Sequence, residues 1–459
     1  MSKTMTIIGA VVVVAIVIAA GAIVVVNNND DNGNSDAPIA SKLQIRGNAN
    51  DDATIDSKDM EIVDDILSGK KTLEDYPLAD YDGNGKVDQD DKKQLQDLID
   101  RKEGTTVYVL CLDKDGNPAT VSCKYPLRNV VTYATNMQLP VLYANGGQYI
   151  AGYFSTSYKV AESSISSSAE DLKGKSREIT DAAWQNFTAL DGKLASSGGV
   201  GALLADSSGT SQFTEQRIND LKAAKIPLII YSSADTNAEI ETVLTVGFLF
   251  GSDCEKKSYD YAQKSWNVID QINKKTESLK SNERTSYISC TMYIYICQND
   301  STYNSSPATA GGIPYYTINN EFKEKYKGSS STKMSSTEAL SNYTDVGCII
   351  NNRSMDYGLN AEEIKNMIID TWDHSNKGTS STEYFKGFED RLYYVNNILP
   401  GAVKVAYMAH ALYGELFSLE WANGILQEYI DMGYGPLQGQ TLDSIVSFVD
   451  VNIYNAAKA

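Results

Sequence analysis

Hydrophobic residues are spaced in different ways along this chain, beginning with a continuous run near the N-terminus. Residues 7–26 are Ile, Val, Ala and Gly only, without a charge. A helix of about 20 such residues spans about 30 Å, the thickness of the hydrocarbon layer of a bilayer. Lys3 precedes the run, and Asp30, Asp31 and Asp36 follow it. Because basic residues favour the cytoplasmic side, this pattern predicts a transmembrane helix with the rest of the chain outside.

A cleaved signal peptide is the alternative, with Ala20, Gly21 and Ala22 as a small-residue cleavage site. The run is longer than the about 7–15 apolar residues of a typical signal, which favours an uncleaved anchor at 1–26. No cysteine stands at the end of the run, so a lipid-anchored lipoprotein is disfavoured. Residues 27–42 are polar and turn-rich, and predict a linker. Both interpretations place everything after residue 26 outside the cytoplasm.

Apolar runs and helical spacing alternate in the larger, C-terminal part of the chain. The first predicted elements are strands at 200–205 and 226–231 and helices at 214–225 and 237–250. Thr236 and Glu239 match a capping box at the start of the last of these helices. Strands that alternate with helices predict parallel βαβ units.

One long helix interrupts this alternation. Residues 255–280 contain neither Gly nor Pro, and Ala262, Trp266, Ile269 and Ile272 form one apolar stripe. The alternation then resumes, with strands at 287–296, 346–351 and 402–407 and helices at 361–372 and 419–432. The fold class is therefore α/β, with two Rossmann-like lobes, 105–253 and 282–459, joined by the single helix 254–281.

The formal net charge of -19 is unevenly distributed. Residues 48–103 hold 17 acidic and 8 basic residues, a local net charge of -9. This concentration indicates cation-binding loops. No basic stripe is present that could neutralise phosphates, which argues against a nucleic-acid partner.

Two stretches of this acidic segment, 48–59 and 80–91, follow one template for calcium. Calcium takes about six to eight oxygen ligands, which such a loop supplies from positions 1, 3, 5, 7, 9 and 12, position 7 through its backbone carbonyl. The predicted ligands are Asn48, Asn50, Asp52, Thr54, Asp56 and Asp59 in the first loop and Asp80, Asp82, Asn84, Lys86, Asp88 and Asp91 in the second. Asn48 in place of Asp, and Ala53 in place of the usual turn glycine, predict that the first site is weaker.

The paired loops resemble the dockerin family. Position 12 is Asp59 or Asp91 rather than Glu, a helix is predicted after each loop but not before it, and the loop starts are 32 residues apart. The resemblance covers about 43–102 and implies a small all-α calcium module, 43–104, that binds a cohesin domain of a partner protein. In that family, partner choice tends to depend on loop positions 10 and 11, which are here Ser57, Lys58, Gln89 and Asp90.

Six cysteines occur without CxxC spacing, which argues against a zinc or iron–sulfur site. Cys111 and Cys123 flank a turn between strand-like runs at 107–112 and 119–124. A disulfide across this hairpin, which would suit an extracytoplasmic protein, and two half-buried thiols are both open.

The segment from residue 125 resembles the opening of the substrate-binding proteins of iron-siderophore, haem and vitamin B12 ABC importers. The shared pattern consists of Pro126 and Arg128, an apolar strand at 130–133, a helix at 137–144, Gly146-Gly147 and a second strand at 149–153. Residues 221–266 and 403–430 resemble later parts of the same family. The match spans about 105–459 and implies a cleft between two lobes that binds a metal chelate or tetrapyrrole.

Cleft residues are predicted by position, because parallel sheets bind ligands at the carboxyl ends of their strands. Tyr side chains stack on flat ligands or bind ferric iron, and Arg forms paired hydrogen bonds with carboxylates. The candidates are Tyr133, Thr135, Asn136, Tyr153, Ser207 and Ser232 in the first lobe and Gln298, Asn299, Tyr303, Asn352, Arg353, His410 and Tyr413 in the second.

Catalysis has little support in the sequence. His374 and His410 are the two histidines, and neither a Gly-x-Ser-x-Gly elbow nor a Gly-rich phosphate loop is present. The sequence therefore predicts a non-enzymatic, membrane-tethered extracytoplasmic protein that captures an iron chelate, haem or corrinoid for an ABC importer permease. The alternative is a cell-surface scaffold or adhesion protein that docks to a cohesin-type partner, with no transport role for the α/β body.

Overall fold

Two sheets, each with its own helices, organise the chain. The computed structural model describes residues 36–133, 135–154, 159–173, 178–297, 301–327, 331–376 and 379–459. Residues 37–459 form one compact unit. The predicted anchor at 1–26 and residues 27–35 of the linker lie outside the described residues. Within the described ranges, no helix has the length and apolar character needed to cross a membrane.

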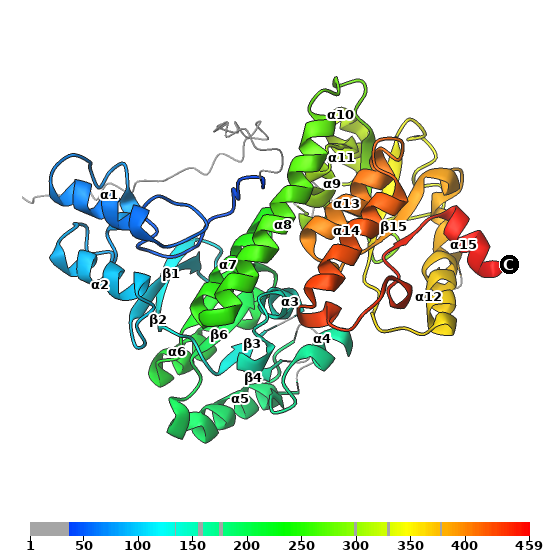
Figure 1. The fold of residues 1–459 in the computed structure, drawn as a ribbon. Helices are drawn as coiled ribbons and strands as arrows, with labels where there is room; N and C mark the ends of the chain where they lie inside the picture. Colours follow the sequence, from blue (N-terminus) through cyan, green and yellow to red (C-terminus); the bar gives the residue numbers. More distant parts are fainter. Residues whose placement is uncertain are drawn as a thin grey trace, which may run out of the picture. The chain divides into compact units, whose positions relative to one another are not determined.

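Five parallel strands form the centre of the first sheet. In sheet order they are β7 (Leu228–Tyr231), β6 (Ala202–Asp206), β3 (Val130–Thr132), β4 (Ile150–Tyr153) and β5 (Glu170–Asp171). The antiparallel hairpin of β1 (Thr106–Leu112) and β2 (Pro118–Lys124) extends this sheet beside β7. Every residue of β6 is buried, as expected of a parallel strand between helix layers. The helices are α3 (Thr135–Tyr143), α4 (Lys159–Ser164), α5 (Asp181–Leu194), α6 (Glu215–Ala224) and α7 (Thr236–Phe250) (Figure 1).

The second sheet also has a parallel centre. Its parallel strands are β10 (Ile313–Pro314), β8 (Ser286–Thr291), β12 (Cys348–Arg353) and β15 (Leu392–Asn396). The antiparallel strands are β9 (Tyr295–Cys297), β11 (Ser331–Lys333) and β16 (Phe448–Val449). The helices of this lobe are α9 (Ser305–Thr309), α10 (Tyr315–Ile318), α11 (Asn320–Lys325), α12 (Ala361–Asp373), α13 (Gly401–Leu412), α14 (Leu419–Met432) and α15 (Val451–Lys458). Ser375–Asn376 and Thr379–Ser380 form a separate small hairpin, β13 and β14.

A single helix, α8 (Ser252–Thr276), joins the lobes and packs on both α7 and α13. Its buried face includes Tyr261, Trp266 and Ile269. The helix predicted at 255–280 is thus present, although it begins and ends a few residues earlier. Gly247 lets α7 approach α8 closely, since a Cβ at this position would lie 2.2 Å from Ser258 Oγ.

Two predicted strands are wrong. Residues 402–407 belong to helix α13, in which nearly every side chain is buried. An apolar run that is buried on all sides has the same pattern in a strand and in a helix. The run at 287–296 is two strands rather than one, because Met292 and Tyr293 take φ angles of 43° and 66° in the turn between β8 and β9.

The predicted capping box of α7 is also wrong. The N-cap is Asp235, whose carboxylate accepts a hydrogen bond of 2.8 Å from the Ala238 N–H. Because Asp235 already caps the helix, the Glu239 carboxylate is free to bind the backbone N–H of Gly401, 2.7 Å away in the second lobe.

Each acidic loop of the N-terminal module is followed by a helix. These helices are α1 (Ser57–Leu67) and α2 (Gln89–Ile99), with one turn of 3₁₀ helix, η1 (Pro77–Ala79), between them. The helices begin with capping boxes formed by Asp56 with Asp59 and by Asp88 with Asp91. The residues at loop positions 9 and 12 thus also define the helix starts.

The predicted linker does not extend to residue 42 as a free spacer. Ser41 is fully buried, and its hydroxyl donates to Asn237 Oδ1 of α7 (2.6 Å) and accepts from Trp266 Nε1 of α8 (2.8 Å). The Ala37 N–H donates to Asn267 Oδ1 of α8 (2.8 Å). Residues 37–42 are therefore bound along two helices of the body.

The acidic module and the body share one hydrophobic core. Ile45 forms an antiparallel bridge with Val109 of β1, and the Arg46 N–H donates to the Tyr108 carbonyl (2.9 Å). Leu95 of α2 belongs to the same buried cluster as Val109 and Phe248 of α7. The module therefore packs against the body as part of one unit.

The hairpin disulfide does not form. All six cysteines, each within the described ranges, are buried free thiols. In the hairpin register Cys111 pairs with Ala119 and Cys123 with Val107, so the two cysteines lie four positions apart along the ladder. At about 3.3 Å per residue, this separation is too long for a disulfide.

Candidate functional site

A cavity of about 120 Å³ lies between the lobes, at the carboxyl ends of the parallel strands. In the first lobe the lining residues lie at or just after the ends of β6 and β7 and in the N-terminal halves of α3 and α7. In the second lobe they lie at the end of β12, just after β15, within 302–306 and in the first turn of α13. The polar ones are Asn136, Asp206, Tyr231, Ser232, Ser233, Asp235, Thr236, Glu239 and Thr242 from the first lobe and Thr302, Tyr303, Ser305, Ser306, Asn352, Asn397 and Lys404 from the second. The cavity thus occupies the place where open parallel sheets usually bind ligands.

Backbone N–H groups accompany each of the three carboxylates that line the cavity. Asp206 accepts from the Ser208 N–H (2.7 Å) and Asp235 from the Ala238 N–H (2.8 Å). Glu239 accepts from the Gly401 N–H and lies 3.6 Å from the Lys404 ammonium. Each carboxylate of the lining therefore has a hydrogen-bond donor, and Lys404 supplies one positive charge beside the three negative ones.

Tyr261 of α8 supplies a further hydrogen-bond donor to Glu239. Its hydroxyl donates to Glu239 Oε1 at 2.6 Å. Burial raises the pKa of Tyr261 well above its usual value, so the hydroxyl keeps its proton and remains a donor. The same Glu239 oxygen therefore accepts hydrogen bonds from the connecting helix and from the second lobe.

Four of the predicted cleft residues line the cavity, namely Asn136, Ser232, Tyr303 and Asn352. Ser207 lies beside it, with its Oγ 3.1 Å from the Ser233 Oγ. Asn299 and its neighbour Gln298 lie outside the described residues. The side chain of Thr135 is not described, although its backbone begins α3.

Three predicted cleft residues are packing residues instead. Tyr133 is buried, with its ring 6.1 Å from that of Phe154 and 5.5 Å from that of Phe213. The Tyr413 hydroxyl donates to the Gly311 carbonyl (2.7 Å) beneath the surface. His410 Nδ1 lies 2.9 Å from the Phe417 carbonyl. Because residues 401–412 form a helix rather than a strand, its first turn reaches the cavity while His410 and Tyr413 lie at its far end.

Tyr153 and Arg353 end their strands but do not line the cavity. The Arg353 guanidinium lies over the Tyr293 ring, 4.7 Å from its centroid. The ring of His374 stacks on Tyr293 with centroids 3.8 Å apart. Arg353 thus belongs to an aromatic stack within the second lobe.

The charged residues of the cavity were missed at the sequence level. Asp206 directly follows the apolar run at 200–205, so the strand-end rule could have included it. Lys404 is a lone cation in an apolar run that was read as a strand, and Glu239 was assigned to a helix cap. Their positions become clear only when the register of α7 and α13 is known.

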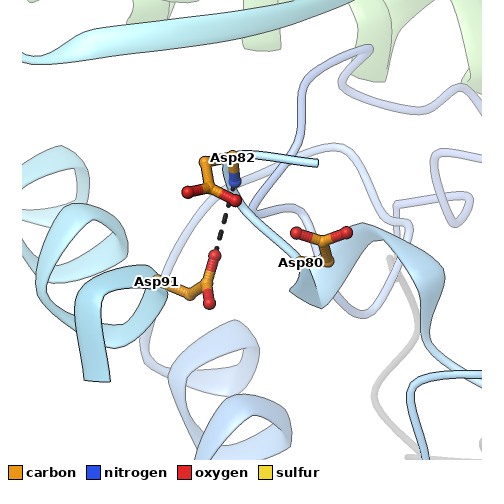
Figure 2. Close-up of side chains that lie close together, drawn as sticks. All are labelled: Asp80, Asp82 and Asp91. Atoms are coloured by element: carbon orange, nitrogen blue, oxygen red, sulfur yellow. Dashed lines mark hydrogen bonds between the residues drawn. The ribbon is translucent and has the colours of Figure 1, made fainter. Parts of the chain in front are cut away.

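The second acidic loop brings three carboxylates together. Oxygens of Asp80, Asp82 and Asp91 lie within 4.8 Å of one another (Figure 2). Asp80 accepts from the N–H groups of Gly83 (2.9 Å), Asn84 (3.0 Å) and Gly85 (2.9 Å), which fold the loop around its carboxylate. An oxygen-rich group of this kind suits a hard divalent cation such as calcium.

The first loop is arranged differently. Asn48 is buried, and its Nδ2 donates to the carbonyls of Leu43 (2.9 Å) and Asp52 (2.7 Å). Asp52 Oδ1 accepts from the Thr54 N–H (2.7 Å). These interactions fold the loop without a carboxylate at position 1.

The loop carboxylates differ in how easily they lose a proton. Burial raises the pKa of Asp59 to about 6 and also raises that of Asp91. A hydrogen bond from the Lys86 ammonium lowers the pKa of Asp88. A cation bound to Asp59 or Asp91 would replace the missing hydration of a buried carboxylate.

Several solved structures are similar to the chain at low identity. The TroA-like periplasmic binding protein FepB from Veillonella parvula is 13% identical, with 74% of this chain and 99% of that chain covered and a TM-score of 0.49. An ABC transporter solute binding protein from Sulfurospirillum deleyianum is 14% identical, with 76% and 98% covered and a TM-score of 0.45. The periplasmic heme-binding protein RhuT from Roseiflexus sp. RS-1 is 10% identical, with 63% and 99% covered and a TM-score of 0.41.

No protein-family model matches the sequence, and no curated protein matches it. At the identities and TM-scores given above, the solved structures assign neither a family nor a ligand to the chain.

Proposed function

We propose that the chain is a non-enzymatic solute-binding protein that captures a metal chelate or tetrapyrrole outside the cytoplasm and delivers it to the permease of an ABC importer. The observation that carries this proposal is the polar cavity between the two α/β lobes, which are joined by α8. Residues of both lobes line this cavity. A solute bound there contacts both lobes, so binding is coupled to their relative position. The chelate class rests on the sequence resemblance.

The size of the cavity limits how such a solute could enter. The cavity between the lobes has a volume of about 120 Å³. Pockets for larger organic ligands have about 300–1,000 Å³. A haem or an iron chelate is larger than this cavity, so its binding requires the two lobes to move further apart.

A matched pair of tyrosine variants tests the cleft. Ferric citrate, haem and vitamin B12 are titrated into the chain by isothermal calorimetry, and at least one is expected to bind. Tyr303→Ala removes a ring that lines the cavity, whereas Tyr259→Ala removes an exposed ring on α8. Loss of a buried contact of about 1–3 kcal/mol weakens binding roughly ten- to a hundredfold. Tyr303→Ala should show this loss and Tyr259→Ala should not; equal affinities would contradict the proposed site.

Calcium is the proposed cofactor of the acidic module, with two sites of which the first is weaker. The cluster of Asp80, Asp82 and Asp91 supports the second site, which would also use Asn84, Asp88 and the backbone carbonyl of Lys86. The first would use Asn50, Asp52, Asp56 and Asp59, with Thr54 through its carbonyl and Asn48 at position 1. Bound calcium would neutralise the crowded carboxylates and stabilise both loops.

Attachment to a membrane and docking to a cohesin-type protein are further parts of the proposal. Ser57, Lys58, Gln89 and Asp90 are exposed and available to a partner. If docking is the main function, a cohesin domain should bind the chain in calcium while the solutes above do not. Cell fractionation tests the tether, since the full chain should remain with membranes and a chain that begins at Asn27 should not.

A further inference from the structure

The first turn of α7 reaches across the cavity to two helices of the second lobe. Glu239 Oε1 accepts hydrogen bonds from the Gly401 N–H (2.7 Å) and the Tyr261 hydroxyl (2.6 Å), and Oε2 lies 3.6 Å from Lys404 Nζ. Thr236, one turn earlier, places its Oγ1 3.4 Å from Ser306 Oγ of α9. Glu239 thus connects α7 of the first lobe, the connecting helix α8 and α13 of the second lobe.

Several features make the Glu239 contacts strong. The carboxylate lies at the N-terminus of α13, where the unpaired N–H groups and the helix dipole favour an anion. Gly401 permits this approach, because a Cβ there would lie 3.1 Å from Glu239 Oε1. The side chains of Glu239 and Lys404 are 18% and 16% exposed, so water screens their attraction only partly.

The position of Glu239 is fixed independently of the second lobe. The cap formed by Asp235 sets the start of α7, and the close approach at Gly247 fixes this helix against α8. A separate inter-lobe hydrogen bond joins the Tyr143 hydroxyl to the Ile398 carbonyl (2.9 Å) in the buried interface. Unlike that neutral contact, Glu239 lines the cavity, and an entering solute would meet it.

We propose that Glu239 is a positioning residue that holds the cleft closed while no solute is bound. Opening the cleft separates Glu239 from Gly401 and Lys404. It thereby exposes two hydrogen-bond donors, the backbone N–H of Gly401 and the ammonium group of Lys404. An anionic group of a solute would then compensate for the lost carboxylate. This consequence for affinity depends on the proposed solute-binding function, whereas the closing role itself can be measured without any solute.

Distances between spin labels measure the closing role directly. Lys222 on α6 and Lys365 on α12 are exposed and lie in different lobes. Each is replaced by cysteine and labelled, while the six native thiols are buried. Pulsed electron paramagnetic resonance of the solute-free protein should give one narrow distance distribution. In Glu239→Ala the distribution should broaden and shift to longer distances, and sodium acetate, but not sodium chloride, should partly reverse the shift.

Two further variants separate the closing role from general damage to α7. Glu239→Gln keeps an oxygen that accepts from Tyr261 and Gly401, and should show a smaller shift. Glu241→Ala removes another carboxylate of the same helix, one that accepts from the Lys42 N–H (3.2 Å) and Gln44 Nε2 (3.0 Å) of the N-terminal segment. Its distribution should match the parent. Unchanged distributions in both Glu239 variants, or an equal shift in Glu241→Ala, would overturn the inference whatever the chain binds.

Discussion

Asn48 and Asp80 hold the first position of the two acidic loops, but they interact with their loops in opposite ways. Asp80 accepts three backbone N–H groups and lies beside two further carboxylates. Asn48 instead donates to two backbone carbonyls, which its amide can do and a carboxylate cannot. The first loop therefore folds around an uncharged side chain, and the second around a charge that a cation can neutralise.

Asp80→Ala should abolish most calcium binding at the second loop. Losing one anionic ligand of a hard cation should raise the dissociation constant at least about tenfold. Calorimetric titration of the full chain with calcium measures this change. Asp90→Asn is the matched control, because it removes an equal charge beside Asp91 at an exposed position outside the predicted ligand set. Equal weakening by both variants would mean that general negative charge, rather than a coordination site, attracts the ion.

At the residue scale, sequence reasoning places strand ends better than it places side chains. Ser232 and Asn352 follow or end parallel strands and do line the cavity. Tyr133 also follows a strand, yet its ring turns toward Phe154 and Phe213. Successive side chains of a strand point to opposite faces, and the face occupied by the last residue depends on its register with neighbours. That register is a tertiary property.

The pairing of α7 with α8 is the element-scale feature that fixes the cavity. α7 carries the first-lobe contacts to α13, and α8 spans both lobes. Gly247 lies where their backbones approach most closely, with the carbonyl of Cys254 2.8 Å from where a Cβ would be. Since backbone cannot move aside cheaply, this position tolerates no larger side chain.

Gly247→Ala should lower the free energy of unfolding by about 2–3 kcal/mol, the cost of forcing an extra group into a packed core. Urea unfolding followed by circular dichroism measures it. Gly424→Ala provides the control, because Gly424 is also inside a helix but has nothing within 4 Å of its added Cβ. There the higher helix propensity of Ala should stabilise the protein by about 0.5–1 kcal/mol. A stable Gly247→Ala protein would show that α7 and α8 can move apart.

The elements that sequence predicts best are those with one polar face. The helix at 419–432 and the connecting helix both have such a face, and both form close to their predicted bounds. α13 has none, because it lies between β15, α8 and α14. Without a polar face the period of the pattern is lost, and the run was read as a strand. Because of that error, the prediction includes His410 and Tyr413 among the cleft residues and omits Lys404.

At the scale of the whole molecule, the acidic module is bound to the body through charge as well as through the shared core. Arg101, which follows α2, donates from Nε to both carboxylate oxygens of Glu255 on α8 (3.1 and 3.0 Å). Its guanidinium also lies over the Phe248 ring of α7, 5.0 Å from the centroid. Arg46, from the segment that pairs with β1, donates to the Asp80 carbonyl (2.7 Å). The second loop and the end of α2 are thereby linked to α8 and to α7, whose first turn lines the cavity.

Calcium should consequently stabilise the body and not only the module. The four tryptophans, Trp184, Trp266, Trp372 and Trp421, all lie in the body, so their fluorescence reports on its unfolding alone. At a calcium concentration about 100 times the dissociation constant, binding adds about 2.7 kcal/mol to the free energy of unfolding of the unit that unfolds together with the site.

Urea unfolding of the full chain should therefore show one transition, with the same midpoint by fluorescence and by circular dichroism. A chelator should move both midpoints together to a lower urea concentration. Asp80→Ala should behave like the chelated protein, and Asp90→Asn like the parent. The opposite result would be a fluorescence midpoint that does not change with calcium, together with a separate, calcium-dependent change in helicity. It would show that the module unfolds independently and that the shared core contributes little cooperativity.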